Sequence, residues 1–208
     1  MAENRPAMRE QTAGIVLAAG MSKRLGIPKQ LLRFKGKYLL EYVLEAALAS
    51  RLDSVFLVLG YESDRIAKAL ELQKAPSRLR KIVNPHYTEG MSRSLCSGLK
   101  AAQSFPSVMF LLGDQPLIDS GTINFLLYRF RESKRDICVP VYGNRRGNPV
   151  IFSQRFYRML KEIEGDIGAR EVIASHEKDV LEVALSDPKI FTDIDTPEDL
   201  ESLKRMDS

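Results

Sequence analysis

Short apolar runs recur along the chain at intervals that favour an alternation of strands and helices. The runs are rich in valine, isoleucine, leucine and phenylalanine, and several of them end at glycine, asparagine or proline. Apolar runs of this length, bounded by turn residues, indicate buried strands. The predicted strands are residues 14–18, 54–59, 81–84, 108–112, 137–142, 148–152, 180–185 and 190–193.

Between these runs, the apolar positions fall three and four residues apart, which is the spacing of amphipathic helices. In residues 39–50, for example, Leu40, Val43 and Ala47 would share one face. The predicted helices are residues 39–50, 63–72, 91–103, 120–132, 154–163 and 168–175, with a last helix after Thr196. This alternation predicts an α/β fold in which helices cover both faces of a mostly parallel sheet. The turn at residues 143–147 would add an antiparallel element at one edge.

The last helix carries a clear start signal. Thr196 can cap it, Pro197 suits its first position, and Asp199 completes a variant of the capping box. We therefore expect the helix to begin at this point.

Length and composition favour one globular domain. The chain has 208 residues, of which 44% are hydrophobic and 28% are charged, and it contains no linker or repeat. We predict a flexible tail at residues 1–12 and one domain at residues 13–208. The tail has no apolar signal segment and no stretch would span a membrane, so a cytoplasmic location and no membrane partner are expected.

Charge and cysteine content exclude some function classes. The net charge is +4, but the cations are spread along the chain rather than gathered on one element, so a nucleic-acid partner is not expected. Cys96 and Cys138 lie in apolar surroundings and are predicted to be buried thiols. No cluster of cysteine and histidine suggests zinc, and His86 and His176 are far apart in sequence.

The loop after the first predicted strand is the first candidate for chemistry. Residues 18–29 contain two glycines and the cations Lys23, Arg24 and Lys29. Main-chain N–H groups exposed by small residues can cradle phosphate oxygens, and the cations would supply charge. The spacing matches neither of the common glycine-rich phosphate loops, so an ordinary turn with surface cations is the alternative.

Acidic residues follow two other strands. Asp114 comes directly after the run at residues 108–112, and Asp193 and Asp195 precede the last helix. In an open parallel sheet, ligands bind beyond the carboxyl ends of the strands, and carboxylates are the oxygen ligands that Mg²⁺ prefers. Asp114 with Asp193 or Asp195 would therefore make a metal site. The alternatives are a turn at Asp114 and acids that only favour a helix N-terminus.

A fourth segment, residues 84–95, runs from a strand into a helix and is rich in hydroxyl groups. Ser92 and Ser94 would either meet the edge of a base or cap the helix.

Taken together, these segments resemble the nucleotidyltransferases that build activated cofactors, above all the molybdenum cofactor cytidylyltransferases and their molybdopterin guanylyltransferase relatives. The resemblance covers about residues 14–203. It is carried by Leu17-Ala18-Ala19-Gly20-x-Ser22-x-Arg24-x-Gly26-x-x-Lys29-Gln30, Gly90-Met91-Ser92-x-Ser94-Leu95, Gly113-Asp114-Gln115-Pro116, Gly147-Asn148-Pro149-Val150, Gly165-Asp166-x-Gly168-Ala169-Arg170 and Asp193-x-Asp195-Thr196-Pro197.

The resemblance implies a single-domain, Rossmann-like nucleotidyltransferase fold with three layers, α/β/α. It implies a catalytic role for Arg24, Lys29 and Asp114, and Mg²⁺ on Asp114 and Asp195. The nucleotide would be bound by Leu17, Ala18, Ala19, Gly20, Ser22, Arg24, Lys29, Ser94 and Gly113. The acceptor would be bound by Asn148, Asp166 and Arg170.

The implied reaction is transfer of CMP from CTP to the phosphate of molybdopterin, with release of pyrophosphate. Ala18-Ala19 resembles the cytidylyl branch more than the guanylyl branch, where GTP would be used. The alternatives are another phosphorylated acceptor, a reductase on the same fold, or a non-catalytic module that binds the nucleotide or cofactor and passes it to a molybdoenzyme. The domain is expected to act as a monomer.

Overall fold

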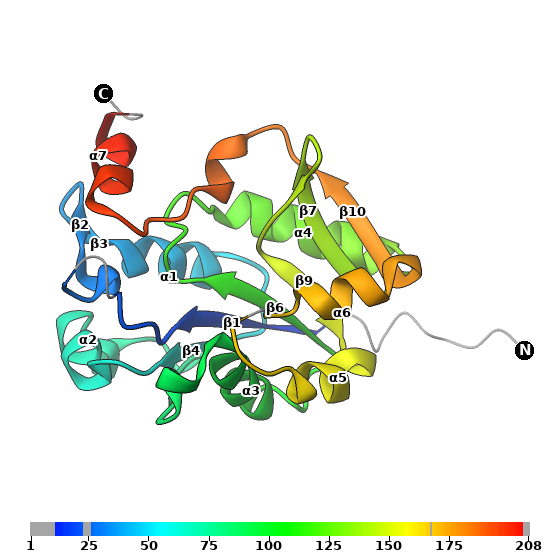
Figure 1. The fold of residues 1–208 in the computed structure, drawn as a ribbon, viewed down its shortest axis with the longest axis horizontal. Helices are drawn as coiled ribbons and strands as arrows, with labels where there is room; N and C mark the ends of the chain where they lie inside the picture. Colours follow the sequence, from blue (N-terminus) through cyan, green and yellow to red (C-terminus); the bar gives the residue numbers. More distant parts are fainter. Residues whose placement is uncertain (1–10, 23–25, 167, 206–208) are drawn as a thin grey trace, which may run out of the picture.

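The computed structural model describes residues 11–22, 26–166 and 168–205, and its centre is a twisted sheet (Figure 1). Within the described residues, eight strands form this sheet, in the order β10-β7-β9-β6-β1-β4-β5, and β8 pairs with β7. The strands are β1 (Thr12–Ala18), β4 (Ser54–Leu59), β5 (Leu79–Val83), β6 (Ser107–Leu112), β7 (Ile137–Tyr142), β8 (Arg145–Arg146), β9 (Val150–Ser153) and β10 (Val180–Ala184).

The middle of the sheet is parallel, as predicted. Strand β1 lies between β4 and β6 and runs parallel to both, and β5 extends the parallel set beyond β4. The predicted antiparallel element is confirmed at the β7–β8 turn. The structure adds that β9 lies inside the sheet, antiparallel to both β6 and β7.

Helices cover both faces of the sheet and make the predicted three layers (Figure 1). On one face α1 (Leu39–Ala49), α2 (Ser63–Ala69) and α4 (Ser120–Glu132) pack over a core that contains Val16 and Leu57. On the other face α3 (Met91–Ala101), α5 (Tyr157–Glu162) and α6 (Arg170–Ser175) pack over Ile15, Phe56 and Phe110. Alternate residues of each strand therefore enter opposite cores, because strand side chains alternate between the two faces.

The last helix, α7 (Pro197–Arg205), begins as predicted. The amide of Thr196 donates to the Asp199 carboxylate at 2.8 Å, and the amide of Asp199 donates back to the Thr196 hydroxyl at 3.2 Å. Leu203 packs with Ile194 and Leu39 in a separate small cluster. Capping and packing together fix the segment that carries Asp195.

Three sequence predictions were wrong in detail. Residues 190–193 are not a strand, because Asp187 caps a 3-10 helix, η7 (Pro188–Phe191), that includes Ile190 and Phe191. Thr12 is not part of a tail: it is the buried first residue of β1, and its hydroxyl bonds to that of Ser107 at 2.8 Å. Residues 1–10 lie outside the described residues.

Cys96, which was predicted to be buried, is only half-buried, whereas Cys138 is buried as predicted.

The structure also contains short elements that the sequence did not predict. One is a small hairpin of β2 (Arg33–Phe34) with β3 (Lys37–Tyr38). The remaining short elements are the 3-10 helices η2 (Lys29–Leu31), η3 (Leu72–Lys74), η4 (Tyr87–Glu89), η5 (Gln154–Phe156) and η6 (Glu177–Asp179). Among the described residues, no helix is long and apolar enough to cross a membrane.

Candidate active site

A cavity of about 400 Å³ opens at the carboxyl ends of β1 and β6, beside the N-terminus of α3. Every predicted nucleotide-binding residue that the structure describes lines it. These residues are Leu17, Ala18, Ala19, Gly20, Ser22, Lys29, Ser94 and Gly113. Arg24, the remaining one, lies outside the described residues. We call this space the first cavity.

Close backbone packing shapes the wall of the first cavity. The amide of Gly113 donates to the carbonyl of Leu17 at 2.9 Å, and a Cβ on Gly113 would lie 2.8 Å from the Cβ of Ala18. Gln30 also lines the cavity, and its Nε2 donates to the carbonyl of Ala18 at 2.7 Å. The motif that contains Gln30 predicts no role for this side chain. Its contact shows that it holds the main chain of the loop in place.

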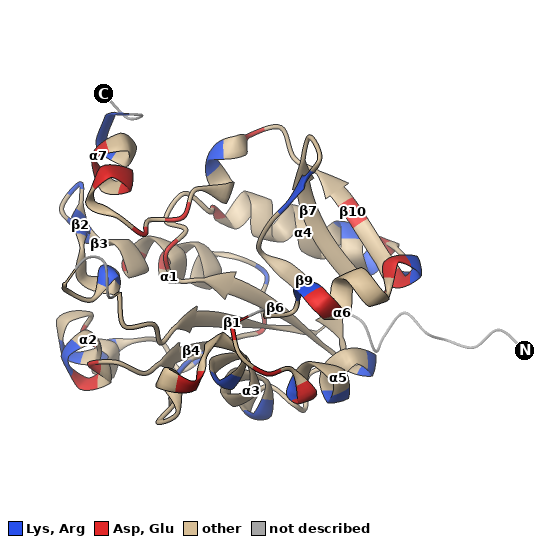
Figure 2. Ribbon diagram, in the orientation of Figure 1, with Lys and Arg blue, Asp and Glu red and all other residues tan. Residues whose placement is uncertain are grey.

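Three charged side chains meet beside the first cavity: Lys29 and Asp114, which line it, and Asp195, which contacts Lys29. The Lys29 ammonium donates to Asp114 Oδ2 and, at 2.7 Å, to Asp195 Oδ1. We call this set the ionic cluster. Figure 2 shows the acidic segments after β6 and before α7 on the same side of the sheet. Burial works against the charged ammonium, but the two carboxylates outweigh it and raise the pKa of Lys29 above its usual value.

The two carboxylate segments of the ionic cluster are held together by backbone. The amide of Ile194 donates to the carbonyl of Asp114 at 3.1 Å. Asp193, two residues before Asp195, accepts a bond from Gln115 Nε2 at 2.8 Å instead. Burial raises the pKa of the Asp193 carboxyl. Asp195, rather than Asp193, is therefore the residue that the structure brings to Asp114.

The donor set of the ionic cluster fits a hard divalent cation. Asp114 Oδ1 is buried and has no hydrogen-bond partner among the described residues, which leaves a strong acceptor for a cation. The described residues contain no group of three or more His, Cys, Asp or Glu side chains that could hold a metal by themselves. Water and phosphate oxygens would have to complete the coordination, as is usual for Mg²⁺.

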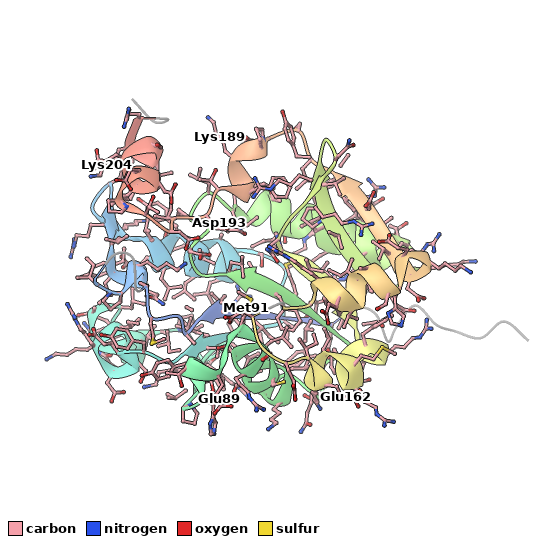
Figure 3. All side chains as sticks on the ribbon, viewed as in Figure 1. Glu89, Met91, Glu162, Lys189, Asp193 and Lys204 are labelled. Atoms are coloured by element: carbon pink, nitrogen blue, oxygen red, sulfur yellow. The ribbon has the colours of Figure 1, made fainter. Side chains whose placement is uncertain are left out.

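A second cavity of about 420 Å³ adjoins the first. All three predicted acceptor-binding residues, Asn148, Asp166 and Arg170, line it, and its walls include apolar side chains such as Phe110 and Phe152. The two cavities share four lining residues, namely Leu17, Met91, Leu112 and Asp166. A ligand in one cavity would thus lie against a ligand in the other. Of the shared residues, Met91 is labelled in Figure 3.

The wall between the cavities includes the start of α3. The amide of Met91 donates to Asp166 Oδ1 at 2.8 Å, and that of Ser92 donates to the carbonyl of Gly165 at 3.1 Å. The approach is so close that a Cβ on Gly90 would lie 2.7 Å from Gly165. Ser92 and Ser94 do not cap α3: its N-cap residue is Gly90, and the side chain that bonds to the first amide of the helix is that of Asp166. Instead, Ser94 Oγ accepts a bond from Asn84 Nδ2 at 3.0 Å.

The sequence missed other lining residues. Tyr87 and Thr88 line the first cavity and Arg146 lines the second. The Arg146 guanidinium bonds to Glu177 at 2.6 and 2.7 Å and to Glu182 at 2.7 Å, and these glutamates raise its pKa. The proximity of Arg146 to the Gly147-Asn148 motif was the available signal.

Two adjoining cavities at the carboxyl edge of a parallel sheet, with a cation and two carboxylates at one of them, define a class of nucleotide-binding α/β enzyme. The comparisons narrow this class. The family model described as the MobA-like NTP transferase domain matches residues 14–180. The chain therefore belongs to this family of nucleotidyltransferases.

Three relatives align with most of the chain. The purine catabolism protein PucB of Bacillus subtilis is 32% identical over 92% of this chain and 95% of its own length. The nicotine blue oxidoreductase of Paenarthrobacter nicotinovorans is 30% identical over 90% of this chain and 93% of its own length. A probable molybdenum cofactor guanylyltransferase of Thermococcus kodakarensis is 30% identical over 72% of this chain and 70% of its own length.

Solved structures agree with the fold. The crystal structure of Rv0371c from Mycobacterium tuberculosis has a TM-score of 0.81 and 29% identity, covering 95% of this chain and 99% of the other. A structure of the same protein in complex with manganese has a TM-score of 0.78 and 27% identity, covering 94% of this chain and 98% of the other. The predicted fold class and family resemblance are thus confirmed.

Proposed function

We propose that this chain transfers CMP from CTP to the phosphate of a molybdopterin-type acceptor and releases pyrophosphate, with the help of Mg²⁺. The observation that carries the proposal is that two cavities of similar size share a wall, and that the ionic cluster lies at the first of them. Transfer between two bound substrates needs this kind of adjacency, because holding the reacting groups together removes much of the entropic barrier.

In this proposal, the first cavity holds the nucleotide. The small residues Ala18, Ala19 and Gly20 would let the main chain approach the base, and Ser94 would lie near it. Arg24 and Lys29 would bind the triphosphate, where cations stabilise charge that develops on the phosphorus and on the leaving pyrophosphate.

Asp114 and Asp195 would hold the divalent cation. The buried Oδ1 of Asp114, which has no partner among the described residues, supports this assignment, and the manganese complex of a structure that is 27% identical supports the use of a divalent cation. When bound, the cation would supply charge neutralisation at the phosphate oxygens.

The second cavity would hold the acceptor, with Asn148, Asp166 and Arg170 on its lining. An oxygen of the acceptor phosphate would form a bond to the α-phosphorus of CTP, while the bond from that phosphorus to the oxygen of the β-phosphate breaks. The acceptor phosphate is already anionic at neutral pH, so the chain need not provide a general base. Apolar walls around Phe110 would keep competing water away.

Two other assignments have specific support. The guanylyltransferase relative favours GTP, whereas Ala18-Ala19 favours CTP through its resemblance to the cytidylyl branch. The nicotine blue oxidoreductase relative favours a reductase on the same fold.

The test is pyrophosphate release with CTP, GTP and ATP in parallel, with and without a molybdopterin-type acceptor and with and without Mg²⁺. We expect release only with CTP, acceptor and metal together. Release that prefers GTP would make the chain a guanylyltransferase. Oxidation of NAD(P)H by a dye, without pyrophosphate release, would overturn the proposal in favour of a reductase.

A further inference from the structure

The position of Lys29 has a consequence for metal binding. Its ammonium occupies the space between the two carboxylates that would hold the cation. We propose that Lys29 keeps divalent cations off the nucleotide-free chain, and that it leaves the carboxylates only when a triphosphate takes over its ammonium. This inference rests on the proposed function, because it concerns the metal and triphosphate of that reaction.

The contacts show that Lys29 is held where it competes with a cation. The Lys29 and Asp114 side chains are only 18% and 16% exposed, whereas Asp195 is 51% exposed. The Lys29 amide donates to Ser22 Oγ at 2.9 Å. The backbone of Lys29 is thus fixed, but its side chain has four rotatable bonds through which the ammonium can move.

The charge of Lys29 is expected to lower the affinity of the two carboxylates for a divalent cation. Two carboxylates without a lysine would present a charge of −2 to a cation, and the ammonium reduces this to −1. A divalent cation that binds Asp114 and Asp195 must displace the ammonium or tolerate its repulsion at a few ångströms. Because the Lys29 and Asp114 side chains are mostly buried, solvent and salt screen the repulsion at Asp114 less than on the surface.

A triphosphate changes the balance by offering the ammonium other partners. Phosphate oxygens are strong acceptors for lysine, so the carboxylates become free at the moment when the phosphates can also bind the cation. Metal and nucleotide would then bind as a coupled pair, and each would raise the affinity for the other by the same factor. The proposal thus makes Lys29 a residue that orders binding, in addition to its role with the triphosphate.

The test measures Mn²⁺ binding to the purified chain without nucleotide or acceptor, from the free Mn²⁺ signal in electron paramagnetic resonance. Lys29→Met should bind Mn²⁺ at least about tenfold more tightly than the wild type, because the competing charge is gone. Lys29→Arg, which keeps the charge, should not gain affinity. Lys37→Met is the matched control, since Lys37 also pairs with a carboxylate, Glu45, but outside the ionic cluster.

The double variant Lys29→Met with Asp114→Asn locates the new site, and it should lose the gained affinity. Circular dichroism of each variant checks folding. The proposal is overturned if folded Lys29→Met binds Mn²⁺ no more tightly than the wild type, or if Lys37→Met or the double variant shows the same gain. The titration contains no substrate, so failure of this inference and failure of the proposed function are distinguished by separate measurements, the Mn²⁺ titration and the pyrophosphate assay.

Discussion

Asp114 differs from the surface carboxylates of this chain because one of its oxygens is buried without a partner among the described residues, while the other bonds to Lys29. An unpaired buried acceptor costs free energy unless a ligand uses it. A substitution of Asp114 therefore tests whether this carboxylate serves ligand binding and not the stability of the fold.

We predict that Asp114→Asn lowers kcat for pyrophosphate release by about 10²–10³-fold, the usual cost of removing one group that stabilises the transition state. Asparagine keeps the size of the side chain but removes the charge that would hold the cation. The measurement is steady-state pyrophosphate release at saturating metal. Asp64→Asn serves as the control, because Asp64 is 95% exposed and bonds only weakly to Lys81, at 3.5 Å. Equal activities of the two variants would remove Asp114 from the site.

At the residue scale, the sequence predicted which side chains line the cavities better than how they contact one another. Local motifs pointed to Lys29, Asp114 and Asp195 separately. The contacts between them join residues 85 and 166 positions apart, and no local pattern encodes such a contact. The role of Asp195 over Asp193 depended on the bond from Gln115 to Asp193, which exists only once β6 and the segment before α7 are side by side.

Helix α3 carries both a cavity wall and a core contact, and Gly98 makes this possible. A Cβ at Gly98 would lie 2.4 Å from Ile15 Cγ2 on β1 and 3.0 Å from Val58 Cγ2 on β4. The helix thus packs against the two strands more closely than any side chain would allow. This close contact sets the height of Met91 and Ser94 above the sheet.

We predict that Gly98→Ala destabilises the chain by about 1–3 kcal/mol, the usual cost of overpacking a core. In an uncrowded helix, the same change from glycine to alanine would stabilise the helix by about 1 kcal/mol. A loss of stability would therefore show that the added methyl group is crowded by β1 and β4. Denaturant unfolding measures the difference. Ser97→Ala, one residue earlier, is the control. Among the described residues, the Ser97 hydroxyl bonds only to the carbonyl of Arg93 in its own helix, so stability should change by less than about 0.5 kcal/mol. Unchanged or increased stability in Gly98→Ala would contradict the tight packing.

At the element scale, long periodic segments were predicted well and short ones were not. The parallel strands and the helices that cover them follow directly from apolar periodicity. Residues 190–193 have the same apolar character as a strand, but the Asp187 cap and Pro188 favour a 3-10 helix there. The place of β9 between β6 and β7 depends on pairing with distant strands, which the pattern of one segment does not contain.

At the scale of the whole molecule, the core on the α1 and α4 face joins strands from both halves of the sheet. Cys138 of β7 is fully buried within it, together with Val16 and Leu57 of the parallel half. Burial raises the pKa of Cys138 to about 12. A group inside this core titrates normally only after the fold opens, so Cys138 reports on the unfolding of the whole domain.

Raising the pH should therefore destabilise the fold through Cys138. The folded thiol keeps its proton up to about pH 12, whereas in the unfolded chain it loses the proton above about pH 8.5. Its stabilising contribution is present below the unfolded pKa and is lost as the pH rises toward the folded one. Between about pH 8 and about pH 10, this costs about 1–2 kcal/mol of unfolding free energy.

Denaturant unfolding of the wild type and of Cys138→Ala at both pH values measures this cost. The variant is less stable at each pH because of the cavity left in the core, but it should lose about 1–2 kcal/mol less than the wild type between them, since it has no thiol to titrate. Cys96→Ala should keep most of the wild-type loss, because Cys96 is only half-buried. An identical loss in the wild type and Cys138→Ala would mean that Cys138 titrates alike in both states, which a closed core spanning both halves of the sheet does not allow.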